Sequence, residues 1–228
     1  MALSESLREG CREVWQALHD HQFIRELAAG TLSPDSFRFY VEQDLFFLPA
    51  LARAAAIGVA RSSDPDAMQH FSEELSLASR HEADEQRGLL QRITGLGATD
   101  RGGGLEPAPA TVAYAGYLID VAARGGPPEL MAALLPCTWS YADIAVALEG
   151  KIAHHPVYEA WVRFFADPGY VALIASRRDA LDTIASELPP ARRHRLGEIF
   201  TMSARLERAF WDMAYRLEQW PDLEVRIA

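Results

Sequence analysis

The chain has 228 residues, of which 49% are hydrophobic and 24% are charged, and its formal net charge is −10. This composition is typical of a soluble protein with one substantial core, and it argues against disorder and coiled coil. The acidic balance argues against nucleic acid and anionic membrane surfaces as partners.

The amino terminus has no apolar signal segment, and the longest apolar run, residues 45–60, is too short to span a bilayer. We therefore expect a cytoplasmic protein whose two cysteines are free thiols.

Nearly every segment has helical rather than alternating periodicity. Residues 95–109 are rich in glycine and proline and predict a loop inside a single domain spanning 1–228. The fold class that follows is an all-α bundle. Its expected helices cover residues 3–19, 21–29, 34–61, 65–94, 110–124, 129–149, a short segment from 156, a segment from 170 to about 188, and 191–219.

The helix expected over 129–149 contains an internal proline, Pro136, directly before Cys137. A proline inside a helix removes a backbone donor and costs roughly 3 kcal/mol, so it predicts a local kink. Tyr141 lies one turn beyond Cys137 and shares its face. A thiol and a phenol presented together at a kink suggest a site.

Two carboxylates interrupt apolar stripes. Asp44 lies between Val41 and Leu48, and Glu207 lies one turn before Phe210. An unpaired buried carboxylate is costly, and desolvation raises its pKa toward the range useful for moving protons. Each residue taken alone is equally compatible with a structural ion pair.

Single aromatic residues such as Phe47, Tyr114 and Tyr141 are most simply interpreted as core packing, and a single cysteine as a small buried hydrophobe. Their combination is more informative, because a thiol can attack carbon, a carboxylic acid can move protons and aromatic rings can enclose a flat ligand. Periodicity does not show that these residues converge in space.

Four separated motifs resemble the TenA family of thiaminase II proteins, and the resemblance extends from His21 to Trp220. The motifs are residues 31–32 with 40–44 (TL and YVEQD), 133–141 (ALLPCTWSY), 155–161 (HPVYEAW) and 207–215 (ERAFWDMAY). The resemblance implies a haem-oxygenase-like all-α fold and a homotetramer. It also implies hydrolysis at the methylene of an aminopyrimidine, either thiamin or 4-amino-5-aminomethyl-2-methylpyrimidine, to give the hydroxymethyl pyrimidine in thiamin salvage. No metal or organic cofactor is implied.

The resemblance also assigns roles by position. Cys137 matches the nucleophile that adds to the ring, and Glu207 matches the acid and base that protonates the leaving group and activates water. Asp44 matches the carboxylate that binds the aminopyrimidine edge. Tyr141 matches a partner of a ring nitrogen, and Tyr114 matches the tyrosine close to the thiol.

The aromatic residues expected to line the pocket include two departures from the family pattern. Phe46-Phe47 replaces a common Tyr-Tyr pair, and Phe165 replaces another tyrosine; Phe210 completes the expected pocket residues. The lost hydroxyls predict fewer hydrogen bonds around Glu207, and one such bond can contribute roughly 10²-fold in rate.

Two alternative functions stay open from the sequence. A metal-dependent oxidase of the same fold could use acidic and histidine residues of one helix, although a solvated charged face is the simpler interpretation of that helix. The residues concerned are His70, Glu73, Glu74, His81, Glu82 and Glu85. A non-catalytic pyrimidine-binding protein is the other alternative, motivated by Phe47 and Phe165.

Overall fold

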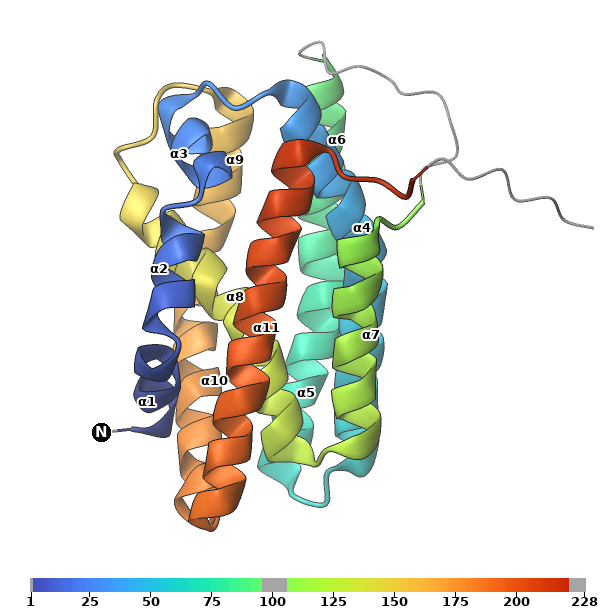
Figure 1. Cartoon of the computed structure of the whole chain (residues 1–228), viewed down its shortest axis with the longest axis vertical. Helices are drawn as coiled ribbons and strands as arrows, with labels where there is room; N and C mark the ends of the chain where they lie inside the picture. Colours follow the sequence, from blue (N-terminus) through green and yellow to red (C-terminus); the bar gives the residue numbers. More distant parts are fainter. Residues whose placement is uncertain (1, 96–105, 222–228) are drawn as a thin grey trace, which may run out of the picture.

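The structure is a computed structural model that describes residues 2–95 and 106–221. Within these ranges the secondary structure is entirely helical. Figure 1 shows long helices running roughly parallel to the long axis, with the short helices α1–α3 at one edge. The prediction of an all-α bundle is confirmed.

The helix boundaries lie within a few residues of most of the expected positions. The helices are α1 (Leu3–Gly10), α2 (Arg12–His19), α3 (Gln22–Ala29), α4 (Pro34–Arg61), α5 (Pro65–Ser76), a π-helix (Leu77–His81), α6 (Glu82–Gly95), α7 (Pro109–Arg124), α8 (Pro127–Leu148), α9 (Pro156–Phe165), α10 (Pro168–Ser186) and α11 (Pro190–Arg216).

Proline defines where many of these helices begin. It fixes φ near the helical value and lacks the N–H that the first turn cannot satisfy, so it favours the first helical position. The described helices with proline there are α4, α5, α7, α8, α9, α10 and α11. At the other end of α3, Gly30 adopts φ 70°, a conformation that glycine takes without strain.

Two expected helices are divided in the structure. The segment 3–19 breaks at Cys11, which has φ −112° and ψ 23° directly after Gly10, so α1 and α2 are separate. The segment 65–94 contains the π-helix between α5 and α6. The predicted continuity was wrong at Cys11, whereas the helical backbone is continuous across the π-helix. The glycine-rich stretch at 102–104 lies outside the described residues.

Helix α8 lies in the core of the bundle and packs against α7, α9, α10 and α11. It runs through Pro136 without ending there. By length and composition alone, α4 and α8 could each cross a membrane, but 56% and 78% of their most apolar windows are buried inside the protein. Their apolar character therefore serves the core.

Candidate active site

Cys137 differs in solvent accessibility from its neighbours in the middle of α8. Every other residue from Pro128 to Ala142 is buried, whereas Cys137 is partly accessible. Its neighbours Glu207 and Tyr141 are themselves 1% and 4% exposed. The thiol therefore lies among buried side chains of the core, where burial and the charge of Glu207 raise its pKa well above the ordinary value.

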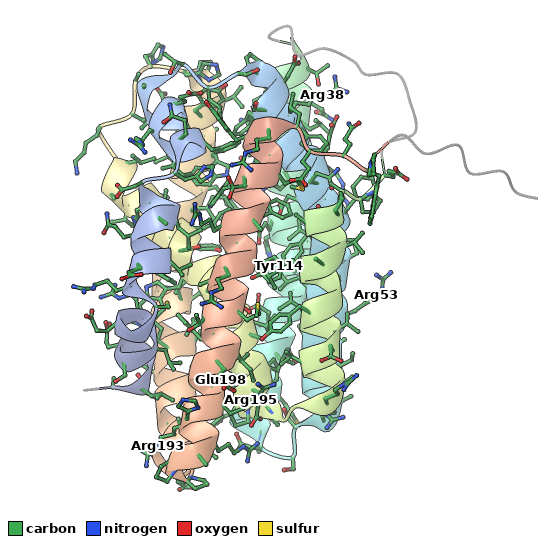
Figure 2. The ribbon with its side chains drawn as sticks, in the orientation of Figure 1. Arg38, Arg53, Tyr114, Arg193, Arg195 and Glu198 are labelled. Carbon is green, nitrogen blue, oxygen red and sulfur yellow. The ribbon has the colours of Figure 1, made fainter. Side chains whose placement is uncertain are left out.

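Glu207 extends from α11 toward this thiol. Burial raises the pKa of Glu207 to about 7, and hydrogen bonding with Tyr114 and Cys137 partly offsets that rise. The Tyr114 hydroxyl and Oε1 of Glu207 nevertheless have no partner at full hydrogen-bond geometry. Both atoms are buried with unused hydrogen-bonding capacity. Figure 2 shows Tyr114 inside the bundle between α7 and α11, whereas Arg53 projects away from it.

Asp44 contributes a second buried carboxyl from α4, with 5% exposure and an unpartnered Oδ2. Burial and the nearby Glu207 raise the pKa of Asp44 to about 8, while hydrogen bonding with Gln86 opposes the rise. Carboxyls that neighbour one another cannot all ionise without repulsion. The site can therefore hold protons near neutral pH.

Aromatic rings form two groups around these polar side chains. On one side, Phe47 lies with its ring centroid 4.7 Å from that of Tyr114 and 5.9 Å from that of Phe210. On the other, Tyr141 meets Phe165 at 4.9 Å in an edge-to-face arrangement. Such walls suit a flat heteroaromatic ring.

The structure thus brings together the catalytic and substrate-binding residues expected from the family resemblance: Asp44, Phe47, Tyr114, Cys137, Tyr141, Phe165, Glu207 and Phe210. Phe46 is different, because it is 36% exposed and lies outside the site. Of the two adjacent phenylalanines, Phe47 alone is buried and packs against Tyr114.

The interpretation of the charged helix as solvated was wrong for three of its residues. His70, Glu74 and Glu82 are buried, whereas His81 is exposed. Glu74 pairs with the buried Arg177 at 2.7 Å. Within the described ranges, no group of three or more histidine, cysteine, aspartate or glutamate side chains is arranged to hold a metal ion.

Two residues of α6 were missed as part of the site's surroundings. Nε2 of Gln86 donates a hydrogen bond of 3.1 Å to the hydroxyl of Tyr40, which also accepts one of 3.0 Å from Trp161. Glu82 lies one turn before Gln86. The four-residue spacing of 74, 78, 82 and 86, all buried, is the signal that could have revealed an inward-facing stripe.

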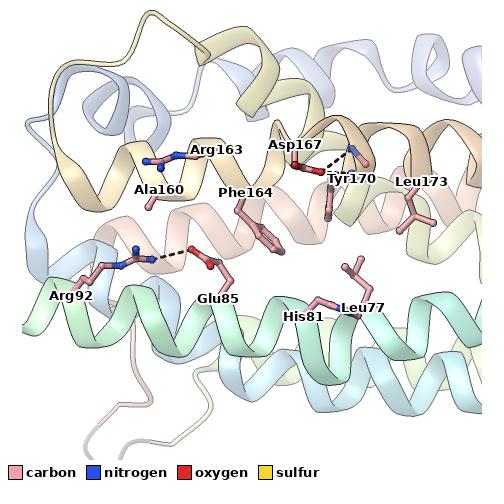
Figure 3. Close-up of a pocket in the computed structure, with 11 residues that line it drawn as sticks. Leu77, His81, Glu85, Arg92, Ala160, Arg163, Phe164, Asp167, Tyr170 and Leu173 are labelled. Atoms are coloured by element: carbon pink, nitrogen blue, oxygen red, sulfur yellow. Dashed lines mark hydrogen bonds and ion pairs between the residues drawn. The ribbon is translucent and has the colours of Figure 1, made fainter.

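A separate pocket of about 460 Å³ lies between the π-helix, α6, α9 and α10 (Figure 3). None of the residues predicted for the site lines it. Tyr170 lines this pocket, and burial together with the charges of Glu82 and Cys137 raises its pKa well above the ordinary value.

Comparison with known proteins places this geometry in context. The family model described as TENA/THI-4/PQQC matches residues 8–217. A protein of Halalkalibacterium halodurans named aminopyrimidine aminohydrolase is 35% identical over 222 residues, covering 96% of this chain and 98% of that protein.

Solved structures show the same fold. A TenA homologue from P. horikoshii OT3 superposes with a TM-score of 0.84 at 29% identity, covering 95% of this chain and 99% of that one. A domain with a heme oxygenase-like fold from Shewanella denitrificans superposes with a TM-score of 0.60 at 16% identity, covering 93% and 92%. The expected haem-oxygenase-like fold is confirmed.

Proposed function

The chain belongs to the TENA/THI-4/PQQC family, and we propose on this basis that it is a thiaminase II-type hydrolase acting at the methylene of an aminopyrimidine. The product is 4-amino-5-hydroxymethyl-2-methylpyrimidine, and the role is thiamin salvage. Of the two substrates considered, we propose the aminomethyl pyrimidine, which loses ammonia.

The observation that carries this proposal is the pairing of Cys137 with Glu207. Cys137 is a partly accessible residue in an otherwise buried stretch of α8, and the carboxyl of Glu207, which interacts with its thiol, has a pKa of about 7. A carboxyl with that pKa is populated in both protonation states at neutral pH, so it can act first as an acid and then as a base.

In the proposed reaction, Asp44 and Tyr141 bind the ring while the sulfur of Cys137 adds to a ring carbon and the thiol proton passes to a ring nitrogen. Electrons released from the ring then expel ammonia, which leaves directly from the ammonium form of the substituent, or from its neutral form after that form takes a proton from Glu207. Glu207 next accepts a proton from the water that attacks the methylene. Expulsion of the sulfur, which recovers its proton, restores the aromatic ring.

These steps use side chains and water alone. The aromatic walls, including Phe47 and Phe165, hold the ring without adding hydroxyl groups near Glu207. Fewer hydrogen bonds at that position favour a slower turnover than a tyrosine-lined pocket would give.

We further propose a cytoplasmic homotetramer without nucleic-acid or membrane partners. The outer faces of α4 and α7 support self-association, because they expose apolar residues with few charges: Phe46, Pro49, Ala56, Val112 and Gly116. Light scattering of purified protein measures the oligomer size, and a monomer at micromolar concentration would contradict this proposal.

The direct test is incubation of the purified protein with the aminomethyl pyrimidine, followed by measurement of ammonia and of the hydroxymethyl product. We expect turnover that falls by at least about 10³-fold in Cys137→Ala, because the nucleophile is removed. Cys11→Ala, which removes the other, buried thiol, is the control and should retain activity.

Unchanged activity in Cys137→Ala would exclude the thiol as the nucleophile. Binding of the pyrimidine without any product in the wild-type protein would instead favour a non-catalytic binding protein. Parallel reactions with thiamin identify the preferred leaving group.

A further inference from the structure

Glu82 is a buried carboxyl that the proposed reaction does not use. It is the first residue of α6, directly after the π-helix Leu77–His81. Such π-helical turns are frequent at functional sites. Glu82 is 5% exposed, and its Oε2 is buried without a hydrogen-bond partner. An unpaired carboxyl oxygen in the core is costly unless a ligand satisfies it.

Glu82 lies on the face of α6 that packs toward the site, because Gln86, one turn later, donates to the hydroxyl of Tyr40, whose ring centroid is 6.5 Å from that of Tyr141. Burial and the charges of Glu207, Glu82 and Asp44 all raise the pKa of Cys137. Burial and, among other charges, that of Glu82 also raise the pKa of the phenols of Tyr40 on α4 and Tyr170 on α10. Glu82 therefore extends from α6 into the interior of the bundle, where Tyr40 of α4 and Tyr170 of α10 also lie.

The interior around Glu82 has more acids than cations. Its electrostatic neighbours include Asp44, Glu74 and Glu207, and burial together with Asp44 and Glu74 raises the pKa of Glu82 well above its ordinary value. Arg177 is the only buried arginine or lysine among the described residues. Because Arg177 already pairs with Glu74 at 2.7 Å, it does not compensate the whole cluster.

A cation placed in this space would reverse the effect of burial and favour the ionised carboxyls. The aminomethyl substituent carries an ammonium group at neutral pH, and the thiazolium of thiamin is permanently cationic. The hydroxymethyl product is neutral. The substrates and the product therefore differ in charge at the atom attached to the methylene.

We propose that Glu82 is a specificity-determining residue that binds the cationic substituent on the methylene and so favours substrate over product. This inference rests on the proposed function for the identity of the ring, and it adds a recognition element for the leaving group. Asp44 recognises the aminopyrimidine edge that substrate and product share, whereas Glu82 recognises the charge that they do not share.

The test compares two ligands that differ only in an ammonium or a hydroxyl group: the aminomethyl and hydroxymethyl aminopyrimidines. Isothermal titration at pH 7 in a Cys137→Ala background measures both affinities without turnover. We expect Glu82→Gln to weaken the ammonium ligand by about tenfold or more and the hydroxyl ligand by less than about threefold. Glu82→Asp, which keeps the charge, should recover part of the selectivity.

Matched variants separate this role from a structural one. Glu85→Gln removes a half-exposed carboxyl of the same helix that pairs with Arg92 at 3.0 Å, and it should change neither affinity. Asp44→Asn should weaken both ligands. Equal losses in Glu82→Gln, or no loss for the ammonium ligand, would overturn the role of Glu82. Failure of the parent protein to bind either ligand would instead contradict the proposed function as well.

Discussion

The polar atoms of the candidate site lie close to one another, but several of them do not form hydrogen bonds of full geometry. The hydroxyl of Tyr114 is within reach of the Glu207 carboxyl, and both have unpartnered oxygens. A donor aimed at a group that changes charge during reaction contributes most when its geometry is fixed in advance. Tyr114 has that position, because its ring is 1% exposed and packed against Phe47.

Tyr114→Phe should therefore lower kcat by roughly 10- to 100-fold with little change in KM. The substitution keeps the aromatic wall and removes only the hydroxyl that acts on Glu207. Steady-state kinetics with the aminomethyl pyrimidine measures the effect. Tyr117→Phe is the control on the same helix, since that hydroxyl donates to the backbone oxygen of Ile199 at 3.3 Å. Equal kcat values for the two variants would contradict a role for the Tyr114 hydroxyl.

The sequence reveals some of these residues better than others. Asp44 and Glu207 stand out because each interrupts an apolar stripe, and burial of both is what such a position predicts. Glu82 does not stand out, since Asp84, Glu85 and Arg87 surround it with exposed or half-exposed charges. Its inward orientation is indicated only by the longer four-residue spacing of 74, 78, 82 and 86, which continues across the π-helix.

Among the helices, the ends were predictable and the internal irregularities were not. Prolines and caps such as Asp64, whose side chain accepts from the N–H of Ala67, act over three or four residues and are visible in sequence. The break at Cys11 and the π-helix depend on packing with distant helices. The convergence of α4, α7, α8 and α11 on one site likewise required tertiary structure or a family resemblance.

Helix α8 combines a regular helix with one internal irregularity beside the thiol. Pro136 cannot donate to the carbonyl of Ala132, which would receive that bond in an uninterrupted helix. If this irregularity sets the position of Cys137, restoring the bond should move the thiol relative to Glu207.

Pro136→Ala is expected to lower kcat by at least about tenfold while the melting temperature stays the same or rises. Alanine restores the donor and has a helix propensity roughly 3 kcal/mol more favourable than proline, although loss of the buried ring offsets part of the gain. Activity assays and thermal unfolding measure both effects. Pro49→Ala, at an exposed position inside α4, should leave activity unchanged; full activity in Pro136→Ala would show that the proline does not position the thiol.

For the whole molecule, the buried carboxyls of the site lower the stability of an otherwise apolar helical bundle. Asp44, Glu82 and Glu207 are each at most 5% exposed, and burial raises the pKa of all three. A fold selected only for stability would place apolar side chains there. Retention of three acids is the pattern expected where stability is given up for activity.

Glu207→Gln should consequently stabilise the protein in a pH-dependent way. Below about pH 4.5 the carboxyl is protonated in both the folded and the unfolded chain. Between pH 4.5 and the folded pKa of about 7 the unfolded chain ionises first, so the stability of the wild-type protein falls as pH rises. Above pH 7 the loss from this residue is complete and amounts to about 3 kcal/mol.

The variant should therefore melt about 5–10 °C above wild type at pH 8 and close to wild type at pH 5, while its hydrolytic activity is lost. Thermal unfolding at the two pH values measures the difference. Glu198→Gln, which changes an exposed carboxyl paired with Arg195 on the same helix, should not raise the melting temperature at pH 8. If Glu207→Gln melts below wild type at pH 8, favourable interactions must stabilise the ionised Glu207 carboxylate in the folded protein. The conclusion that this buried carboxyl destabilises the fold would then be wrong.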